Sequence, residues 1–114
     1  MGIDELRSLS SLLFGHRYRL ELLAVLAHAG TGEGICLKTM ADRFEAPPSV
    51  YHPPLKSLVS AGLVVRMGRT RSDPRVLYAP SESSVWTGLQ AMVEGLEVEL
   101  DFRDVVHART EAAR

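Results

Sequence analysis

The chain is poor in cysteine and has no long apolar run. Cys36 is the only cysteine among 114 residues, which excludes an internal disulfide and fits a reducing compartment such as the cytoplasm. No apolar stretch approaches the roughly 20 residues that a membrane span requires, and no secretory signal is expected. We therefore expect a cytoplasmic, globular protein of one domain without a membrane partner.

Familiar catalytic motifs are also missing. The sequence has no glycine-rich phosphate-binding loop, no nucleophile elbow and no His-Glu-x-x-His pair. Asp101, Asp104 and His107 have a helical spacing that would let them hold zinc between two subunits, but a solvated helix face is the simpler interpretation. The lone Cys36 is expected to be a small core residue. We predict a protein that is not an enzyme, with no cofactor and no metal site.

Net charge is low, at −1, but the two signs are separated along the chain. Residues 66–75 contain four arginines and one aspartate, a local balance of +3. Residues 82–111 contain seven acids and two arginines, a balance of −5. A basic end and an acidic end are expected when one surface of a protein meets a polyanion.

Residues 47–64 have the pattern of a helix, a tight turn and a strand. Leu55, Leu58 and Val59 recur at helical spacing, and Gly62 supplies the left-handed residue that often follows a helix. Val64 then begins a β-branched pair that favours a strand.

The run Ser49–Val64, SVYHPPLKSLVSAGLV, resembles the recognition helix and following strand of winged helix-turn-helix regulators of the ArsR and MarR families. The Leu-Lys-x-Leu and Ala-Gly-Leu-Val parts match without a gap. Pro53 and Pro54 stand where these families usually carry Arg, His or Gln facing the DNA major groove. Because an interior proline costs a helix about 3 kcal/mol or more, the helix either starts late, near His52, or is kinked. Pro48 offers a second starting point.

The preceding residues fit the same resemblance. Two N-terminal helices are expected over residues 1–29, and Arg19–Leu26 resembles the first core helix of ArsR-like domains. The helix-turn-helix is expected over residues 35–64, beginning with a brief strand at Ile35 and Cys36. Its first helix is predicted over residues 37–44, with its apolar residues on one face.

Residues 63–79 predict a hairpin, with strands over 63–67 and 76–79 joined by a loop of Gly, Arg, Ser, Asp and Pro. Such a hairpin is the wing of a winged helix. Asp73-Pro74-Arg75 resembles the Asp-x-Arg of MarR wings, which implies that Asp73 braces the wing and that Arg75 reaches the minor groove. Arginine on a hairpin tip suits a narrow minor groove, where the negative potential is focused.

An apolar stripe predicts one long helix over residues 82–110, with Ser81 or Ser83 as its cap. Its apolar surface exceeds what one small domain can cover, so dimerisation through this helix and the first helix is expected. The predicted interface residues are Leu6, Leu9, Leu13, Val85, Trp86, Leu89, Met92, Leu96 and Leu100.

We therefore predict an α+β, mainly α, winged helix-turn-helix domain with N-terminal and long C-terminal dimerisation helices. The resemblance implies a bacterial, homodimeric transcriptional regulator that binds specific sequences of double-stranded DNA, with its recognition helix in the major groove and its wing on the minor groove or backbone. The predicted DNA contacts are Ser49, Val50, His52, Lys56, Arg66, Arg69, Arg71 and Arg75.

Two alternatives stay open. In the first, the prolines turn the DNA-reading edge into a docking surface, and the chain is a protein-interaction module that does not read bases. In the second, the chain is a ligand-responsive regulator that holds a small-molecule effector between its first helices and its terminal helix. The sequence names neither the effector nor the protein partner.

Overall fold

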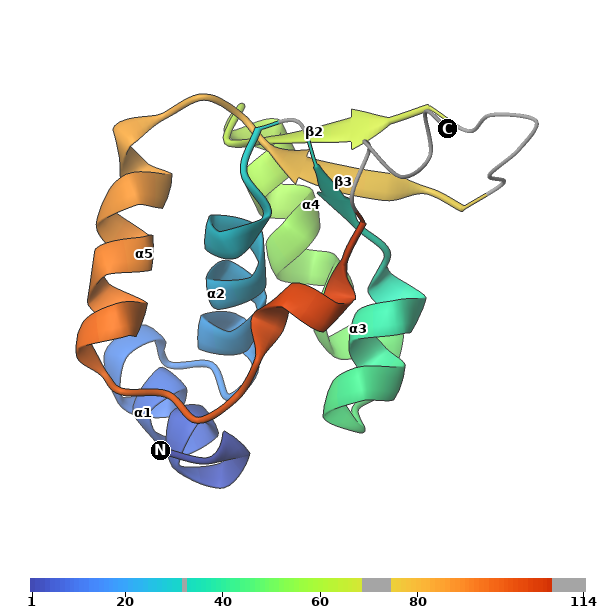
Figure 1. Ribbon diagram of the computed structural model, residues 1–114. Helices are drawn as coiled ribbons and strands as arrows, with labels where there is room; N and C mark the ends of the chain where they lie inside the picture. Colours follow the sequence, from blue (N-terminus) through green and yellow to red (C-terminus); the bar gives the residue numbers. More distant parts are fainter. Residues whose placement is uncertain (32, 69–74, 108–114) are drawn as a thin grey trace.

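Helix α2 forms the centre of the molecule, and the other helices and the sheet pack around it (Figure 1). The computed structural model describes residues 1–31, 33–68 and 75–107. α2 spans Arg19–Ala29, and nearly all of its side chains are buried. A helix that is apolar on all sides must be covered on all sides. Here α1 (Ile3–Phe14), α5 (Ser84–Gly95) and the sheet provide that cover.

The other elements follow in chain order between and after these helices. They are β1 (Gly34–Ile35), α3 (Leu37–Phe44), the 3-10 turn η1 (Pro48–Val50), α4 (His52–Ser60), β2 (Val64–Met67), β3 (Leu77–Pro80), the 3-10 turn η2 (Phe102–Val105) and β4 (Val106–His107). The fold is therefore mainly helical with a small antiparallel sheet, as predicted. Among the described residues, no helix is both long and apolar enough to cross a membrane.

The sheet attaches the wing hairpin to the helical body. Its strand order is β2-β3-β1-β4, and each neighbouring pair is antiparallel. β2 and β3 form the hairpin, and the short β1 lies between β3 and β4, with Ile35 paired on both sides. Gly34 permits this close approach, because a Cβ there would lie 3.0 Å from Met67 Sδ and 3.1 Å from Leu77 Cβ.

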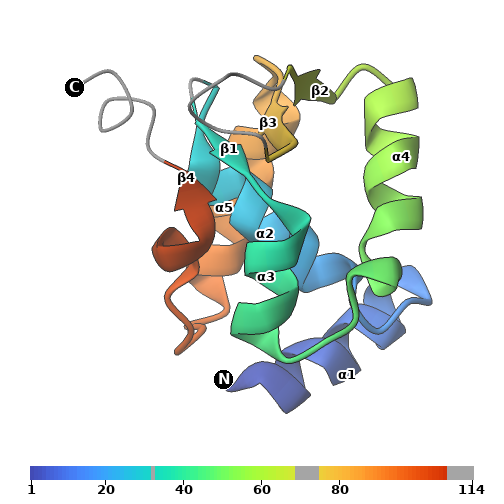
Figure 2. The ribbon, with the colours of Figure 1, turned by 90° about the vertical axis from the view of Figure 1, so that its right-hand side faces the viewer.

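The prolines in η1 and in the first turn of α4 determine how α4 begins; Figure 2 shows how these elements follow α3. η1 starts at Pro48, and α4 starts four residues later at His52. Pro53 and Pro54 lie in the first turn of α4, where a missing backbone N–H removes no intrahelical bond. Both predicted starting points are thus used, the first by a 3-10 turn and the second by the α-helix.

A glycine turn places the wing directly after α4. Gly62 has a φ of +77°, in the left-handed region that residues with a Cβ rarely adopt. The Leu63 N–H donates to the carbonyl of Leu58 at 3.0 Å, so the chain reverses at once and enters β2 at Val64. The helix, glycine turn and strand follow one another as the sequence predicted.

The C-terminal region corrects the prediction of one long helix over residues 82–110. α5 begins where expected, since the Ser83 hydroxyl caps it by accepting a bond from the Val85 N–H at 3.2 Å. It ends at Gly95, and Glu97, with a φ of 51°, turns the chain back towards the core. The described part of this region therefore contains a helix of 12 residues followed by an irregular return.

The physical reason lies in two overlapping apolar periods. Leu96 and Leu100 fit the helical stripe, but Leu96, Val98 and Leu100 also alternate with acids, which is the period of an extended chain. Phe102 then finds a buried place against Phe44, with ring centroids 5.9 Å apart. Apolar residues that were predicted to lie on a dimerisation helix, such as Leu96 and Leu100, thus pack against the core of their own protomer.

Candidate nucleic-acid interface

η1 and α4 together, residues 48–60, form the recognition segment. Its inner face is apolar, since Pro54 and Leu55 are buried and Leu58 is half-buried against the core. Its outer face is polar, and its predicted contacts Ser49, His52 and Lys56 are exposed. The segment is amphipathic because the spacing of its apolar residues matches the helical period.

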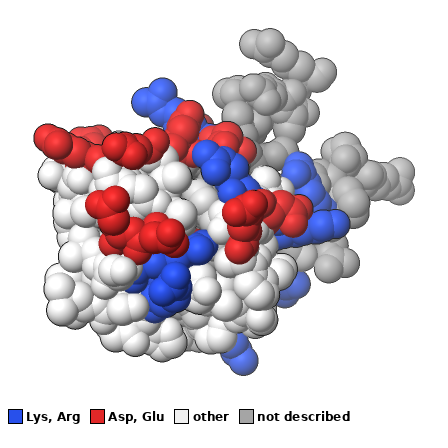
Figure 3. Space-filling view, turned by 90° about the horizontal axis from the view of Figure 1, so that it is seen from below, with Lys and Arg blue, Asp and Glu red and all other residues white. Residues whose placement is uncertain are grey.

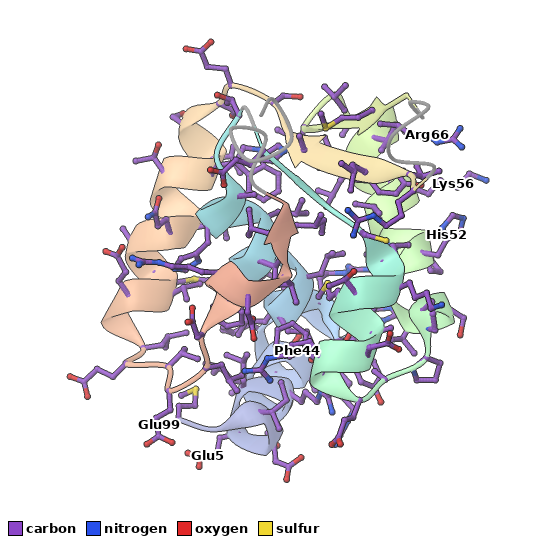
Figure 4. The ribbon with its side chains drawn as sticks, turned by 45° about the vertical axis from the view of Figure 1, so that its right-hand side comes forward. Glu5, Phe44, His52, Lys56, Arg66 and Glu99 are labelled. Atoms are coloured by element: carbon purple, nitrogen blue, oxygen red, sulfur yellow. The ribbon has the colours of Figure 1, made fainter. Side chains whose placement is uncertain are left out.

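His52, Lys56 and Arg66 project from the same edge of the molecule, away from its body (Figure 4). His52 and Lys56 lie one turn apart on α4, and Arg66 comes from β2. Val50 is half-buried. The described edge therefore combines a helix face with a strand residue beside it, a shape that fits the major groove and its adjoining phosphates.

The prolines limit what the start of α4 can offer to a phosphate. Helix N-termini bind anions through free backbone N–H groups. Pro53 and Pro54 have none, and the N–H of Leu55 already donates to the carbonyl of Tyr51 at 3.1 Å. Contacts with a nucleic acid at this point must therefore come mainly from side chains, His52 first among them.

Charge favours the same edge. Between Glu45 and Asp73 the sequence contains no acidic residue. Acidic side chains lie elsewhere, with Glu5 on α1 and Glu99 after α5 at the far end from the labelled basic residues (Figure 4). The molecule seen from below carries acidic and basic side chains interspersed on one face (Figure 3). A polyanion would meet least repulsion at the recognition segment and β2.

The wing is only partly described. Arg75 is exposed just before β3. Arg69, Arg71 and the predicted brace Asp73 lie outside the described residues, so their predicted roles have no geometry to support or oppose them.

Two grooves border the helices. One of about 310 Å³ lies between α2 and α4 and is lined by Arg19, Leu22, Leu23, Pro54, Ser57, Leu58 and Ala61. The Nε of Arg19, one of the lining residues, is buried without a hydrogen-bond partner in the described part of the chain. The other, of about 190 Å³, lies between the end of α2 and the start of α5, nearer to the place predicted for an effector.

The predicted dimer contacts divide into core and surface residues. Leu6 and Trp86 are core residues of the protomer, and the Trp86 Nε1 donates to the carbonyl of Leu63 at 3.0 Å. Assigning these two to an interface was wrong, because apolar spacing alone does not distinguish the inner side of a helix from the outer. Leu13 and Val85 are exposed, and the remaining five, half-buried, are Leu9, Leu89, Met92, Leu96 and Leu100.

Three residues that the structure singles out had no predicted role. Leu12 is 81% exposed and extends the apolar surface of Leu13. Arg7 and Glu21 form a buried ion pair, with the Nε of Arg7 2.8 Å from the Oε1 of Glu21. A signal for this pair was present, since Glu21 is the only acid in the otherwise largely apolar α2.

The zinc alternative does not fit the geometry. Asp101 caps η2 by accepting a bond from the N–H of Arg103, and Asp104 pairs with Arg43 of α3. The chain around them is not an α-helix, so the expected helical face does not exist. Within residues 1–31, 33–68 and 75–107, no cluster of three or more metal-binding side chains occurs.

No protein-family model and no curated protein sequence matches the chain. Solved structures share its fold. CouR from Rhodococcus jostii RHA1, bound to p-coumaroyl-CoA, superposes with a TM-score of 0.53 at 24% identity, over 82% of this chain and 63% of CouR. The transcriptional regulator BldR from Sulfolobus solfataricus gives 0.57 at 20% identity, over 83% and 68%. A MarR-family transcriptional regulator from Rhodococcus sp. RHA1 gives 0.52 at 22% identity, over 82% and 63%.

These similarities establish the fold. The chain spans less than two thirds of the length of CouR and of the MarR-family regulator from Rhodococcus sp. RHA1, and about four fifths of it superposes on each of the three structures. The predicted resemblance to MarR regulators is confirmed for the fold, and two of the matched proteins are transcriptional regulators.

Proposed function

We propose that this chain, with its winged-helix fold of the MarR type, is a homodimeric, cytoplasmic transcriptional regulator that binds specific sequences of double-stranded DNA. The outer face of the recognition segment would enter the major groove, with Ser49, Val50 and His52 near base edges. Lys56 and Arg66 would contact the phosphates on either side. The observation that carries this proposal is the shared edge of His52, Lys56 and Arg66, in a part of the chain without acids.

The wing supplies a second contact in this proposal. Arg69, Arg71 and Arg75 would lie on the minor groove or the backbone, with Asp73 bracing the hairpin. Each arginine that neutralises a phosphate releases condensed counterions, which makes affinity depend on salt. The four basic residues between positions 66 and 75 therefore predict strongly salt-dependent binding.

Dimerisation would place two recognition segments on one face of the duplex, about one helical turn apart. The exposed apolar residues Leu12 and Leu13, at the end of α1, and Val85, at the start of α5, supply surface for a second copy. α5 lies across α2 from α4 in Figure 1, so contact there would leave the DNA-reading edge free. A homodimer through α1 and α5 is the arrangement that we propose.

The proposal is tested by selecting preferred sites from random duplex DNA and measuring binding across a range of salt concentrations. For Arg69→Ala/Arg71→Ala/Arg75→Ala, we expect weaker binding and a salt slope lowered by about 2.7, from three lost phosphate contacts at about 0.9 each. An unchanged slope would reject the wing contacts. A wild-type protein that binds no duplex would favour the protein-interaction module instead.

A ligand-responsive regulator is a second candidate, favoured by the groove between α2 and α4. This groove combines an apolar lining with Arg19, whose buried Nε has no hydrogen-bond partner among the described residues, and residues of α4 form one wall. A molecule with an apolar body and an anionic group would satisfy both features and would bear directly on the recognition segment. Loss of DNA affinity on adding such a molecule would support this regulation, and a response unchanged in Arg19→Met would argue against the groove as its site.

A further inference from the structure

Three buried polar side chains from three separate elements meet between α1 and the start of α4. They are Arg7 of α1, Glu21 of α2 and Tyr51, the residue directly before α4, and we call them the Arg7–Glu21–Tyr51 cluster. The Nε of Arg7 donates to Glu21 Oε1 at 2.8 Å, its Nη2 donates to Oε2 at 3.1 Å, and the Tyr51 hydroxyl donates to the same Oε2. Exposure is 8% for Arg7, 1% for Glu21 and 0% for Tyr51.

The cluster holds both helices of the helix-turn-helix at the point where they approach each other. Besides binding Glu21, the Nη2 of Arg7 donates to the carbonyl of Phe44 at 2.7 Å, at the end of α3. Tyr51 stands at the start of α4. One guanidinium–carboxylate pair therefore connects the end of α3 with the beginning of α4.

Aromatic packing restricts the geometry further. The ring of Tyr18 lies 4.9 Å below the guanidinium of Arg7, and it meets the ring of Tyr51 edge-on at 6.2 Å. Burial, followed by the bond to Glu21, raises the pKa of Tyr51 well above its ordinary value of 10.0. The hydroxyl thus keeps the proton that it donates to Glu21.

Local structure gives α4 few other polar attachments at its start. No side chain in the described part of the chain caps the helix, and Pro53 and Pro54 have no N–H to donate. Apolar packing could hold the segment against the core, but apolar contacts are not directional. Hydrogen bonds from charged donors to a carboxylate are directional. Proteins in which apolar residues replace a buried ion pair are often no less stable, so stability alone does not explain such a pair. Orientation of α4 is the contribution that the cluster can make and that a leucine could not.

We propose that Arg7, Glu21 and Tyr51 are positioning residues that fix the direction of α4. Through them, specific DNA recognition depends on the position of α1 against the rest of the domain. The inference rests on the proposed DNA-binding function. It also links two surfaces, because α1 carries Leu12 and Leu13 of the proposed dimer contact while Tyr51 begins the DNA-reading helix.

Tyr51→Phe tests the cluster with one atom removed, and Tyr18→Phe is its matched control. The Tyr18 hydroxyl makes no hydrogen bond with the described residues, so its loss leaves the cluster intact. For Tyr51→Phe we expect about tenfold weaker binding to the selected site, the size of one charge-assisted hydrogen bond, with non-specific affinity and salt slope unchanged. Tyr18→Phe should match the wild type. A wild-type ratio of specific to non-specific affinity in Tyr51→Phe would overturn the inference.

Amide hydrogen exchange on the free protein gives a readout that does not need DNA. In Tyr51→Phe and Glu21→Gln, we expect the amides of residues 55–60 to exchange about tenfold faster while α5 exchanges as in the wild type. Faster exchange confined to α4 would support positioning even if the wild type bound no DNA, in which case only the proposed function would fail. Unchanged exchange in α4, or an equal rise throughout the chain, would overturn the positioning role.

Discussion

The inner and outer sides of the recognition segment use polar residues in opposite ways. On the inner side, Tyr51 is fully buried and bonded to Glu21. On the outer side, the side chains of His52 and Lys56 are exposed and bond to none of the residues that the structure describes. Polar groups inside a protein must find partners there, whereas polar groups outside stay available to another molecule. The inner residues are thus expected to determine stability and orientation, and the outer ones binding.

The largest expected effect concerns the inner side. Arg7→Met removes the charge partner of Glu21 and leaves a buried carboxylate with only the hydrogen bond from Tyr51, so we expect the free energy of unfolding to fall by about 3–5 kcal/mol. Denaturant unfolding measures this loss, and Arg7→Met/Glu21→Met should recover most of it. The matched outer change, Lys56→Met, should alter stability by less than about 0.5 kcal/mol. Equal losses of unfolding free energy in Arg7→Met and Lys56→Met would contradict the different roles of the inner and outer sides.

The next effect concerns the outer side and should appear only in binding. His52→Ala removes a side chain from the proposed base-reading face, and we expect about 1–3 kcal/mol less discrimination at the base pair that it contacts. Competition between the selected site and its single-base variants measures this change. A uniform loss over all variants would instead place His52 on a phosphate.

The raised pKa of Tyr51 predicts a pH dependence on the inner side. Below pH 10 the tyrosine is protonated in both folded and unfolded chains, and its contribution to stability is fully present. Above about pH 10 the unfolded chain releases the proton while the folded chain keeps it, so stability falls by up to about 1.4 kcal/mol per pH unit. The difference in free energy of unfolding between wild type and Tyr51→Phe, measured between pH 9 and 11, isolates the contribution of the Tyr51 hydroxyl. Parallel curves for the two proteins would show that Tyr51 titrates as in the unfolded state.

The smallest effect is that of a single phosphate contact. For Lys56→Ala, we expect similarly weaker binding to all sequences and a salt slope lowered by about 0.9. Its thermal stability should remain that of the wild type. A change in sequence preference with an unchanged slope would instead make Lys56 a base-reading residue.

The helix-turn-helix was predictable because several local signals agreed. Leu55 and Leu58 gave the helical spacing, Gly62 gave the stop, and the prolines restricted the start of α4 to two places that the structure uses in turn. Agreement among spacing, stop and start signals is typical of sequences that specify one local structure.

Other features could not be predicted because they depend on distant residues. Arg7 and Glu21 are 14 positions apart, and Glu21 and Tyr51 are 30 apart. In sequence, each resembles an ordinary charge or aromatic residue on a helix. The return of the chain after Gly95 likewise depends on a place for Phe102 beside Phe44, which no local pattern reveals.

The proposed function is tested most directly by titrating wild-type protein into duplex DNA that carries its selected site, beside a scrambled duplex, at physiological salt. We expect one protein dimer per site, with affinity for the selected duplex at least about a thousandfold above that for the scrambled one. Equal affinity for both duplexes, or a monomer that binds neither even in dilute buffer, would contradict a DNA-reading dimer.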